Sequence, residues 1–159
     1  MSNPKSAAQP LAVNRKARHD YHISDTYEAG IMLTGAEVKA VRAGRLSLRD
    51  CYAKFDRHNE LWLINAHIGD YQPGEQAKIE PTRRRKLLLH KSELHRLLGQ
   101  ANQKGLTLVP LAAYSSRGRI KIEVGLAKGK KLYDKKEDKK RADIKRDIQR
   151  EIKSAHYKL

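Results

Sequence analysis

The last 32 residues of the chain, 128–159, are too charged to form a hydrophobic core of their own. They contain 13 Lys or Arg and 6 Asp or Glu, a net charge of +7. The chief apolar positions, Ile144, Ile148 and Ile152, are four residues apart and would drift slowly along one helical face. Such a segment buries too little apolar surface to offset its conformational entropy. We predict a tail, 129–159, that is disordered when free and becomes helical on a strongly anionic partner.

The overall charge also indicates an anionic partner. The chain has 159 residues and a formal charge of +16, which fits one domain plus a tail and favours nucleic acid. No apolar run approaches the ~20 residues that span a bilayer, and the N-terminus lacks the apolar stretch of a secretory signal. Cys51 is the only cysteine, so an intrachain disulfide is excluded and a reducing compartment is indicated. We expect a cytoplasmic monomer with no membrane association.

Hydrophobic alternation and turn residues predict a mainly β domain over residues 14–128, after a flexible leader at 1–13. Strand patterns cover 18–33, 50–56, 61–68, 107–114 and 119–126, with a short buried element at 87–89. In the first strand, Gly30 suggests a bulge. Residues 69–85 are predicted to be a loop.

Two helices are predicted between the strands. Thr34 and Glu37 fit a capping box, and the helix that they begin ends at Gly44. A second helix is predicted at 92–103, with three leucines on one stripe. An oligonucleotide-binding (OB) type antiparallel β-barrel with short helices fits this pattern best, and an open α+β sheet is the alternative.

No enzymatic motif is evident. HExxH, CxxC, GxGxxG and the GxxxxGK[ST] phosphate loop are all absent, so we predict no catalytic residue, metal or cofactor. A metal-dependent nuclease would need clustered carboxylates to bind Mg²⁺. The only dense acidic group in the domain is Asp20, Asp25 and Glu28, so a nuclease is the weakest of the functional hypotheses. Cys51 has no histidine at a motif spacing and is expected to be inert.

Four basic clusters predict a surface that follows RNA or DNA phosphates. They are residues 14–18, the helix positions Lys39, Arg42 and Arg45, residues 83–86, and residues 128–131. Each neutralised phosphate releases counterions, so binding should depend steeply on salt. Tyr21, Tyr27, Tyr114 and Tyr133 are candidates for stacking on unpaired bases, although a core role is equally open for the strand tyrosines.

Several motifs in order along the chain resemble one family. They are Asn14-Arg15-Lys16-Ala17-Arg18-His19-Asp20-Tyr21, Glu28-Ala29-Gly30-Ile31, the run from Gly35 to Gly44, Pro81-Thr82-Arg83, Arg85-Lys86-Leu87-Leu88-Leu89, and Gly125-Leu126-Ala127-Lys128-Gly129-Lys130-Lys131. Together they resemble the SmpB family, the transfer-messenger RNA (tmRNA, SsrA RNA) binding proteins of bacterial trans-translation.

The resemblance implies an OB-like barrel that binds the tRNA-like domain of tmRNA. It also implies delivery of that RNA to stalled ribosomes, with elongation factor EF-Tu as an indirect partner. The tail is then expected to enter the empty mRNA channel beside the small-subunit rRNA of the decoding centre. A ribosomal or ribosome-assembly protein that binds rRNA through the same basic barrel is the alternative.

Candidate contact residues follow from the clusters and the resemblance together. For RNA they are Asn14, Arg15, Lys16, Arg18, Tyr21, Glu28, Lys39, Arg42, Arg45, Arg83, Arg85, Lys86, Lys128, Lys130 and Lys131. For the ribosome they are Gly129, Tyr133, Asp134, Lys135, Lys136, Arg141, Ile144, Ile148 and Ile152.

The tail departs from the family pattern. Where the family usually reads His-Asp-Lys-Arg, this chain has Tyr133-Asp134-Lys135-Lys136, and a second Asp-Lys-Lys-Arg follows at 138–141. The first copy follows Gly129 as in the family and is the one we expect in the decoding centre.

Overall fold

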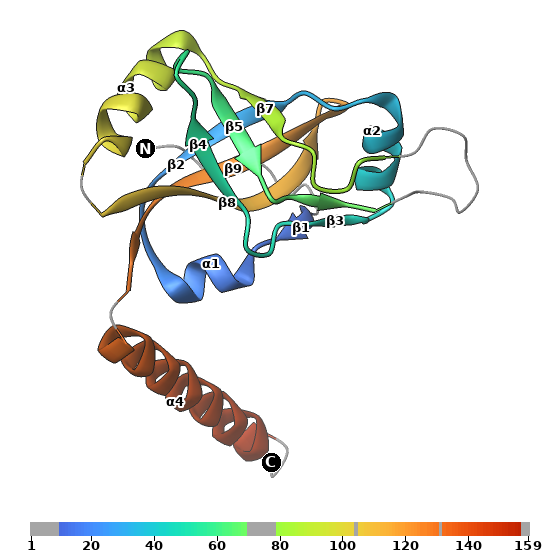
Figure 1. Cartoon of the computed structure of the whole chain (residues 1–159). Coiled ribbons are helices and arrows are strands. Elements are labelled where there is room, and N and C mark those ends of the chain that lie inside the picture. Colours follow the sequence, from blue (N-terminus) through green and yellow to red (C-terminus); the bar gives the residue numbers. More distant parts are fainter. Residues whose placement is uncertain (1–9, 70–78, 104, 131, 157–159) are drawn as a thin grey trace. The chain divides into compact units, whose positions relative to one another are not determined.

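A closed ring of antiparallel strands forms the first of the two units into which the chain divides after Gly129 (Figure 1). The computed structural model describes residues 10–69, 79–103, 105–130 and 132–156. In the first unit the elements are β1 (Pro10–Val13), α1 (Arg15–Asp20), β2 (Tyr21–Ile31), α2 (Gly35–Arg42), β3 (Leu46–Ser47), β4 (Tyr52–Phe55), β5 (Leu61–Ile64), β6 (His67–Ile68), β7 (Arg85–Leu88), α3 (Lys91–Ala101), β8 (Leu106–Ser116) and β9 (Arg119–Gly129). The second unit contains α4 (Leu132–His156).

The strand order closes the sheet on itself. Neighbours run β8-β4-β5-β7-β2-β9, and β9 pairs again with β8. β1 pairs with residues 112–114 of β8, on the edge that also meets β4 at Leu108, while β3 and β6 form a separate two-stranded ladder. The ring decides between the two predicted architectures in favour of the OB-like barrel over the open sheet.

The longest hairpin follows from simple alternation. In β9, Ile120, Ile122 and Val124 are buried while the residues between them are more accessible. The turn into β9 is the two-residue loop Arg117-Gly118, with φ of 51° and 75°. Positive φ at both positions is the type I′ geometry that matches the twist of the flanking strands.

The core lies inside the ring and is closed by two helices. Leu61 and Leu63 of β5 are almost fully buried, as is Leu87 of β7. α3 contributes Leu97 and α2 contributes Val41 to the same cluster. Both helices therefore cover the barrel with apolar side chains, and in α3 these come from the leucine stripe that the sequence predicts.

α2 begins with the predicted capping box and is held by a buried ion cluster. The Thr34 hydroxyl accepts a hydrogen bond from the Glu37 N–H, and Glu37 Oε1 accepts one from the Thr34 N–H at 3.0 Å. Glu37 is only 2% exposed and also pairs with Arg85 of β7 and with Arg83, whose Nη2 lies 2.5 Å from Oε1. The side chain that starts the helix thus also ties it to the barrel.

Three predictions for the N-terminal region are wrong. Pro10–Val13 is not part of a flexible leader but pairs with β8, because Leu11 and Ala12 pack against the core. Residues 18–20 belong to α1 rather than to the first strand, since Asn14 caps a helix there. The bulge in β2 lies between Ile23 and Asp25, whereas Gly30 keeps regular pairing with Lys121 and Leu88.

In the second unit, the described residues 132–156 form the helix α4. Lys130 forms an ion pair with Asp138, which joins the segment before the helix to its first turns. Ile144, Ile148 and Ile152 are 50–62% exposed along α4. None of the helices in the described residues is both long and apolar enough to cross a lipid bilayer.

We predict that the Glu37 cluster makes the stability of the barrel acid-sensitive. Burial alone would raise the pKa of Glu37, but hydrogen bonds from Arg83, the Thr34 N–H and Arg85 outweigh it and lower the pKa to about 2 from 4.5. The stabilisation is therefore complete above about pH 4.5 and is lost as the pH falls toward 2. At pH 7, Glu37→Gln should lower the free energy of unfolding by about 3 kcal/mol, because it leaves Arg85 buried without a counter-charge.

Urea unfolding of both proteins between pH 7 and pH 2.5 measures this difference. The difference in free energy of unfolding between wild type and Glu37→Gln should become smaller below pH 4.5. Asp50→Asn is the control, since the Asp50–Lys16 pair is exposed and screened by water. A gap that stays constant down to pH 2.5 would contradict the assignment.

Candidate nucleic-acid interface

The predicted cluster at 14–18 and Lys128 of the last cluster lie at the α1 end of the barrel. Arg15, Lys16 and Arg18 are exposed on α1. In the strand that follows α1, Tyr21 pairs with Gly129 and His22 pairs with Lys128. The ladder between β2 and β9 therefore brings Lys128 to the end of the barrel where the cluster at 14–18 lies, although more than a hundred residues separate them.

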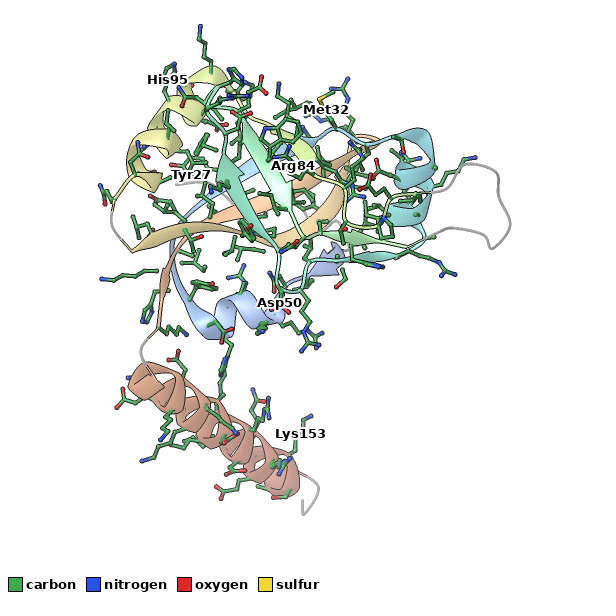
Figure 2. The ribbon with its side chains drawn as sticks, in the orientation of Figure 1. Tyr27, Met32, Asp50, Arg84, His95 and Lys153 are labelled. Carbon is green, nitrogen blue, oxygen red and sulfur yellow. The ribbon has the colours of Figure 1, made fainter. Side chains whose placement is uncertain are left out.

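One lysine of this end is neutralised within the protein. Lys16 Nζ lies 2.7 Å from Asp50 Oδ1, and Figure 2 shows Asp50 beside α1. Tyr21 is half-buried and packs against the small cluster of Ala17, Val109, Leu111 and Ala127. Tyr21 is thus partly a core residue, and only part of its ring is available to a base.

The α2 cluster lies at the other end of β9. Lys39, Arg42 and Arg45 are all exposed, and Arg42 Nη2 donates a hydrogen bond to the Gly118 carbonyl at 2.9 Å. Gly118 is in the turn before β9, and Lys128 is near the end of that strand. At about 3.3 Å per residue, the two basic ends are roughly 30 Å apart.

The cluster at 83–86 divides between the interior and the surface, so the prediction of a basic loop is wrong for Arg85. Arg85 is fully buried in β7, where Nη1 donates to the Ala66 carbonyl at 2.9 Å and Nε donates to Glu37. A guanidinium in this position is unavailable to RNA. Arg83 also turns toward Glu37 and is 37% exposed.

The two remaining residues of this cluster face outward. Arg84 lies over the Trp62 ring, 5.6 Å from its centroid, and Figure 2 places Arg84 in front of β5. Lys86 Nζ pairs with Glu60 at 3.0 Å. Of this cluster, Arg84 is therefore the charge most available to RNA, although the contacts predicted from the sequence are Arg83, Arg85 and Lys86.

Asn14 is also misassigned as a surface contact. It is 6% exposed, its side-chain amide donates to the Pro110 carbonyl at 2.9 Å, and its Oδ1 accepts from the Ala17 N–H. Pro110 lies at a register shift in β8, where the ladder leaves a carbonyl to be satisfied. Asn14 thus links α1 to β8 through buried hydrogen bonds.

Glu28 lies on the outer surface of β2 and is held by a tyrosine. The Tyr114 hydroxyl on β8 donates to Glu28 Oε2 at 2.5 Å. Directly opposite Glu28, on β9, is Glu123. Burial and the hydrogen bond to Glu28, with a further contribution from Glu123, raise the pKa of Tyr114 well above its usual value, so its hydroxyl remains a donor.

Metal-ligating side chains and the one cysteine were the other candidates for chemistry in the described residues. These residues contain no group of three or more His, Cys, Asp or Glu side chains placed to hold a metal ion. Cys51 is buried, and burial raises its pKa to about 12, which keeps the thiol protonated at neutral pH.

The tail residues are only partly within the described side chains. Lys136 and Arg141 are exposed on α4, as are the three isoleucines. The side chains of Tyr133, Asp134 and Lys135, and the whole of Lys131, lie outside the described residues. The two copies of the tail motif are therefore not distinguished by geometry.

Comparison with known proteins agrees with this arrangement. The family described as SmpB protein matches residues 11–154. The chain belongs to the SmpB family. An SsrA-binding protein from Symbiobacterium thermophilum is 52% identical over 139 residues, covering 87% of each chain. One from Carboxydothermus hydrogenoformans is 56% identical over 128 residues, covering 80% of this chain and 85% of the relative.

A solved structure gives the same result in three dimensions. It is described as "tmRNA-SmpB: a journey to the center of the bacterial ribosome" and superposes with a TM-score of 0.64 at 55% identity. The match covers 76% of this chain and 84% of the other. At 55% identity, the two chains have the same barrel fold.

We predict that Asn14 contributes to folding rather than directly to RNA contact. Asn14→Ala should lower the free energy of unfolding by about 1–3 kcal/mol, because it removes the cap of α1 and leaves the buried Pro110 carbonyl unsatisfied. Asn14→Ser keeps a capping oxygen and should recover part of the loss. Urea unfolding measures both variants, and wild-type stability in Asn14→Ala would contradict the structural role.

Proposed function

We propose that this protein binds the tRNA-like domain of tmRNA and brings it to stalled ribosomes in the cytoplasm, as an RNA-binding adaptor without catalytic activity. The observation that carries the proposal is the match to the SmpB family over residues 11–154. The chain is also 52% and 56% identical to two proteins described as SsrA-binding. The relatives do not favour the alternative of a general rRNA-binding ribosomal protein.

The barrel, residues 14–128, is the proposed RNA-binding body. Exposed cations lie at both of its ends, roughly 30 Å apart, which suits a large folded RNA that contacts both ends at once. Arg15, Arg18, Lys39, Arg42, Arg45 and Lys128 are the proposed phosphate contacts that are exposed in the structure. Arg84 joins them through its outward position over Trp62.

Glu28 is proposed to recognise donors on the RNA. A carboxylate repels phosphates, so its place on an RNA-binding surface requires a base amino group, an imino group or a 2′-hydroxyl as its partner. The Tyr114 hydroxyl donates to Oε2 and fixes the carboxylate, while Oε1 accepts no hydrogen bond from the residues that the structure describes. The opposed carboxylate of Glu123 favours the same outcome, since a donor from RNA relieves the like-charge contact.

The tail, 129–159, is proposed to serve the ribosomal step. Its exposed charges suit an rRNA-lined channel, and the Ile144, Ile148 and Ile152 stripe offers an apolar face to ribosomal protein or RNA bases. That the tail is disordered when free and becomes helical in the channel stays a prediction. We place Tyr133–Lys136 in the decoding centre and 138–141 beyond it.

The Glu28–Tyr114 pair gives a test of the body. Glu28→Ala should weaken binding to the isolated tRNA-like domain by tenfold or more, since it removes a charged acceptor. Tyr114→Phe removes only the hydroxyl and should give a smaller loss, because Glu28 remains but is no longer fixed. Fluorescence anisotropy with labelled RNA measures both affinities.

Glu60→Ala is the matched control, because it removes a partly exposed carboxylate that pairs with Lys86 on another part of the barrel. It should bind as well as wild type or slightly better. If Glu28→Ala binds like Glu60→Ala, Glu28 has no place in the interface.

The function as a whole is tested by pull-down and truncation. Full-length protein expressed in bacteria should recover tmRNA in large excess over its share of cellular RNA, and a chain that ends after Lys131 should recover it nearly as well. The truncated chain should fail to support tagging on stalled ribosomes. Recovery of bulk rRNA instead would favour the ribosomal-protein alternative, and tagging by the truncated chain would remove the tail from the mechanism.

A further inference from the structure

The tip of the β8–β9 hairpin contains an arginine in a backbone conformation that disfavours it. Arg117 has φ of 51° in the type I′ turn, a position where Asn, Asp and Gly are the common residues. Gly118 follows with φ of 75°, and Arg119 begins β9 opposite Ser116. The turn geometry does not explain an arginine at this strained position. We therefore attribute the residue to the positive charge that it carries.

α2 meets this tip directly. Arg42 Nη2 donates to the Gly118 carbonyl at 2.9 Å, which joins residues 76 positions apart. Figure 1 shows α2 at the end of the barrel where this hairpin turns. Lys39 precedes Arg42 by three residues and so lies on the same helical face. The fold therefore gathers four cations from two elements, Lys39, Arg42, Arg117 and Arg119, which we name the tip cluster.

The tip cluster differs from the other basic groups in its lack of internal counter-charge. Its four side chains are all exposed, and none forms a salt bridge with any residue that the structure describes. In contrast, Lys16, Arg83, Arg85 and Lys86 each pair with a carboxylate. Like charges held together at a rigid turn repel one another unless an anion joins them.

Arg42 retains donors for such an anion. A guanidinium has five N–H groups, and the bond to Gly118 uses one of them. Arg117 and Arg119 add two more guanidinium groups, whose planar forks match the oxygens of a phosphate. The bond from Arg42 also fixes the turn, so that the two arginines are presented by a rigid hairpin rather than by a flexible loop.

We propose that the tip cluster binds the RNA phosphate backbone, with Arg117 and Arg119 as its main contacts and Arg42 serving both as a tether of the turn and as a ligand. The proposal rests on the RNA-binding function proposed above and adds two arginines that the family motifs do not include. The phosphates belong either to tmRNA or to rRNA, and separate binding arms distinguish these two sources.

The test is the double variant Arg117→Asn, Arg119→Thr in the full-length protein. Asn is favoured at the first position of a type I′ turn and Thr is favoured in strands, so the hairpin should fold at least as well as in wild type. The matched control is Arg57→Ser, Arg96→Gln, which removes two exposed charges from the β4–β5 turn and from α3. The melting temperatures of all three proteins check that they are folded.

Binding is measured against the isolated tRNA-like domain and, separately, against small ribosomal subunits with an empty mRNA channel. In one of the two arms the tip variant should lose tenfold or more in affinity, and its plot of log affinity against log salt should be shallower by about 2, as expected for two lost phosphate contacts. The control should lose much less and keep the wild-type slope. Loss with the tRNA-like domain assigns the phosphates to tmRNA, and loss with the subunit assigns them to rRNA.

Affinity equal to that of the control in both arms would overturn the proposal. This result is distinguishable from failure of the proposed function. That failure would appear in the wild-type protein as binding to the tRNA-like domain no tighter than to unfractionated tRNA. In that case the subunit arm alone decides whether the tip cluster binds phosphate.

Discussion

The buried carboxylate of Glu37 is the interaction on which the positions of the other elements depend. It starts α2 through the capping box, and it receives Arg85 from β7 and Arg83 from the segment before that strand. Arg85 in turn donates to the carbonyls of Ala66 and Glu80. One charge thus joins a helix, a strand and two connecting segments, and a buried guanidinium without it would be strongly destabilising. The orientation of α2 also sets where Arg42 meets the β8–β9 turn.

Polar and basic residues of the barrel perform two different tasks. Arg85 and Asn14 satisfy internal groups, whereas Arg15 and Lys39 lie in solvent. Counting basic residues in clusters therefore overstates the number of phosphate contacts, because some charges are already neutralised. It also overlooks Arg117 and Arg119, which form no cluster in the sequence and come close to Arg42 only through the hairpin. The charge that is available to RNA is a property of the fold.

The sequence predicted features whose causes are local and missed those whose causes are distant. The Thr34–Glu37 capping box and the alternation of Ile120, Ile122 and Val124 are confirmed, because each depends on neighbours along the chain. The burial of Arg85 depends on Glu37, 48 residues away, and that of Asn14 depends on Pro110, 96 residues away. α1 was missed because six residues with one buried alanine carry no helical period. The family resemblance, by contrast, was carried by separate motifs and is confirmed.

The central claim is that the barrel binds tmRNA while the tail serves the ribosome. Amide hydrogen exchange of the full-length protein tests it most directly, with and without the isolated tRNA-like domain and then with ribosomal subunits. The RNA domain should slow exchange in the barrel, around β2 and the exposed basic ends, and should leave residues 132–156 unchanged. Ribosomal subunits should then slow exchange in 132–156. Protection of the tail by the RNA domain alone, with an unchanged barrel, would contradict the account.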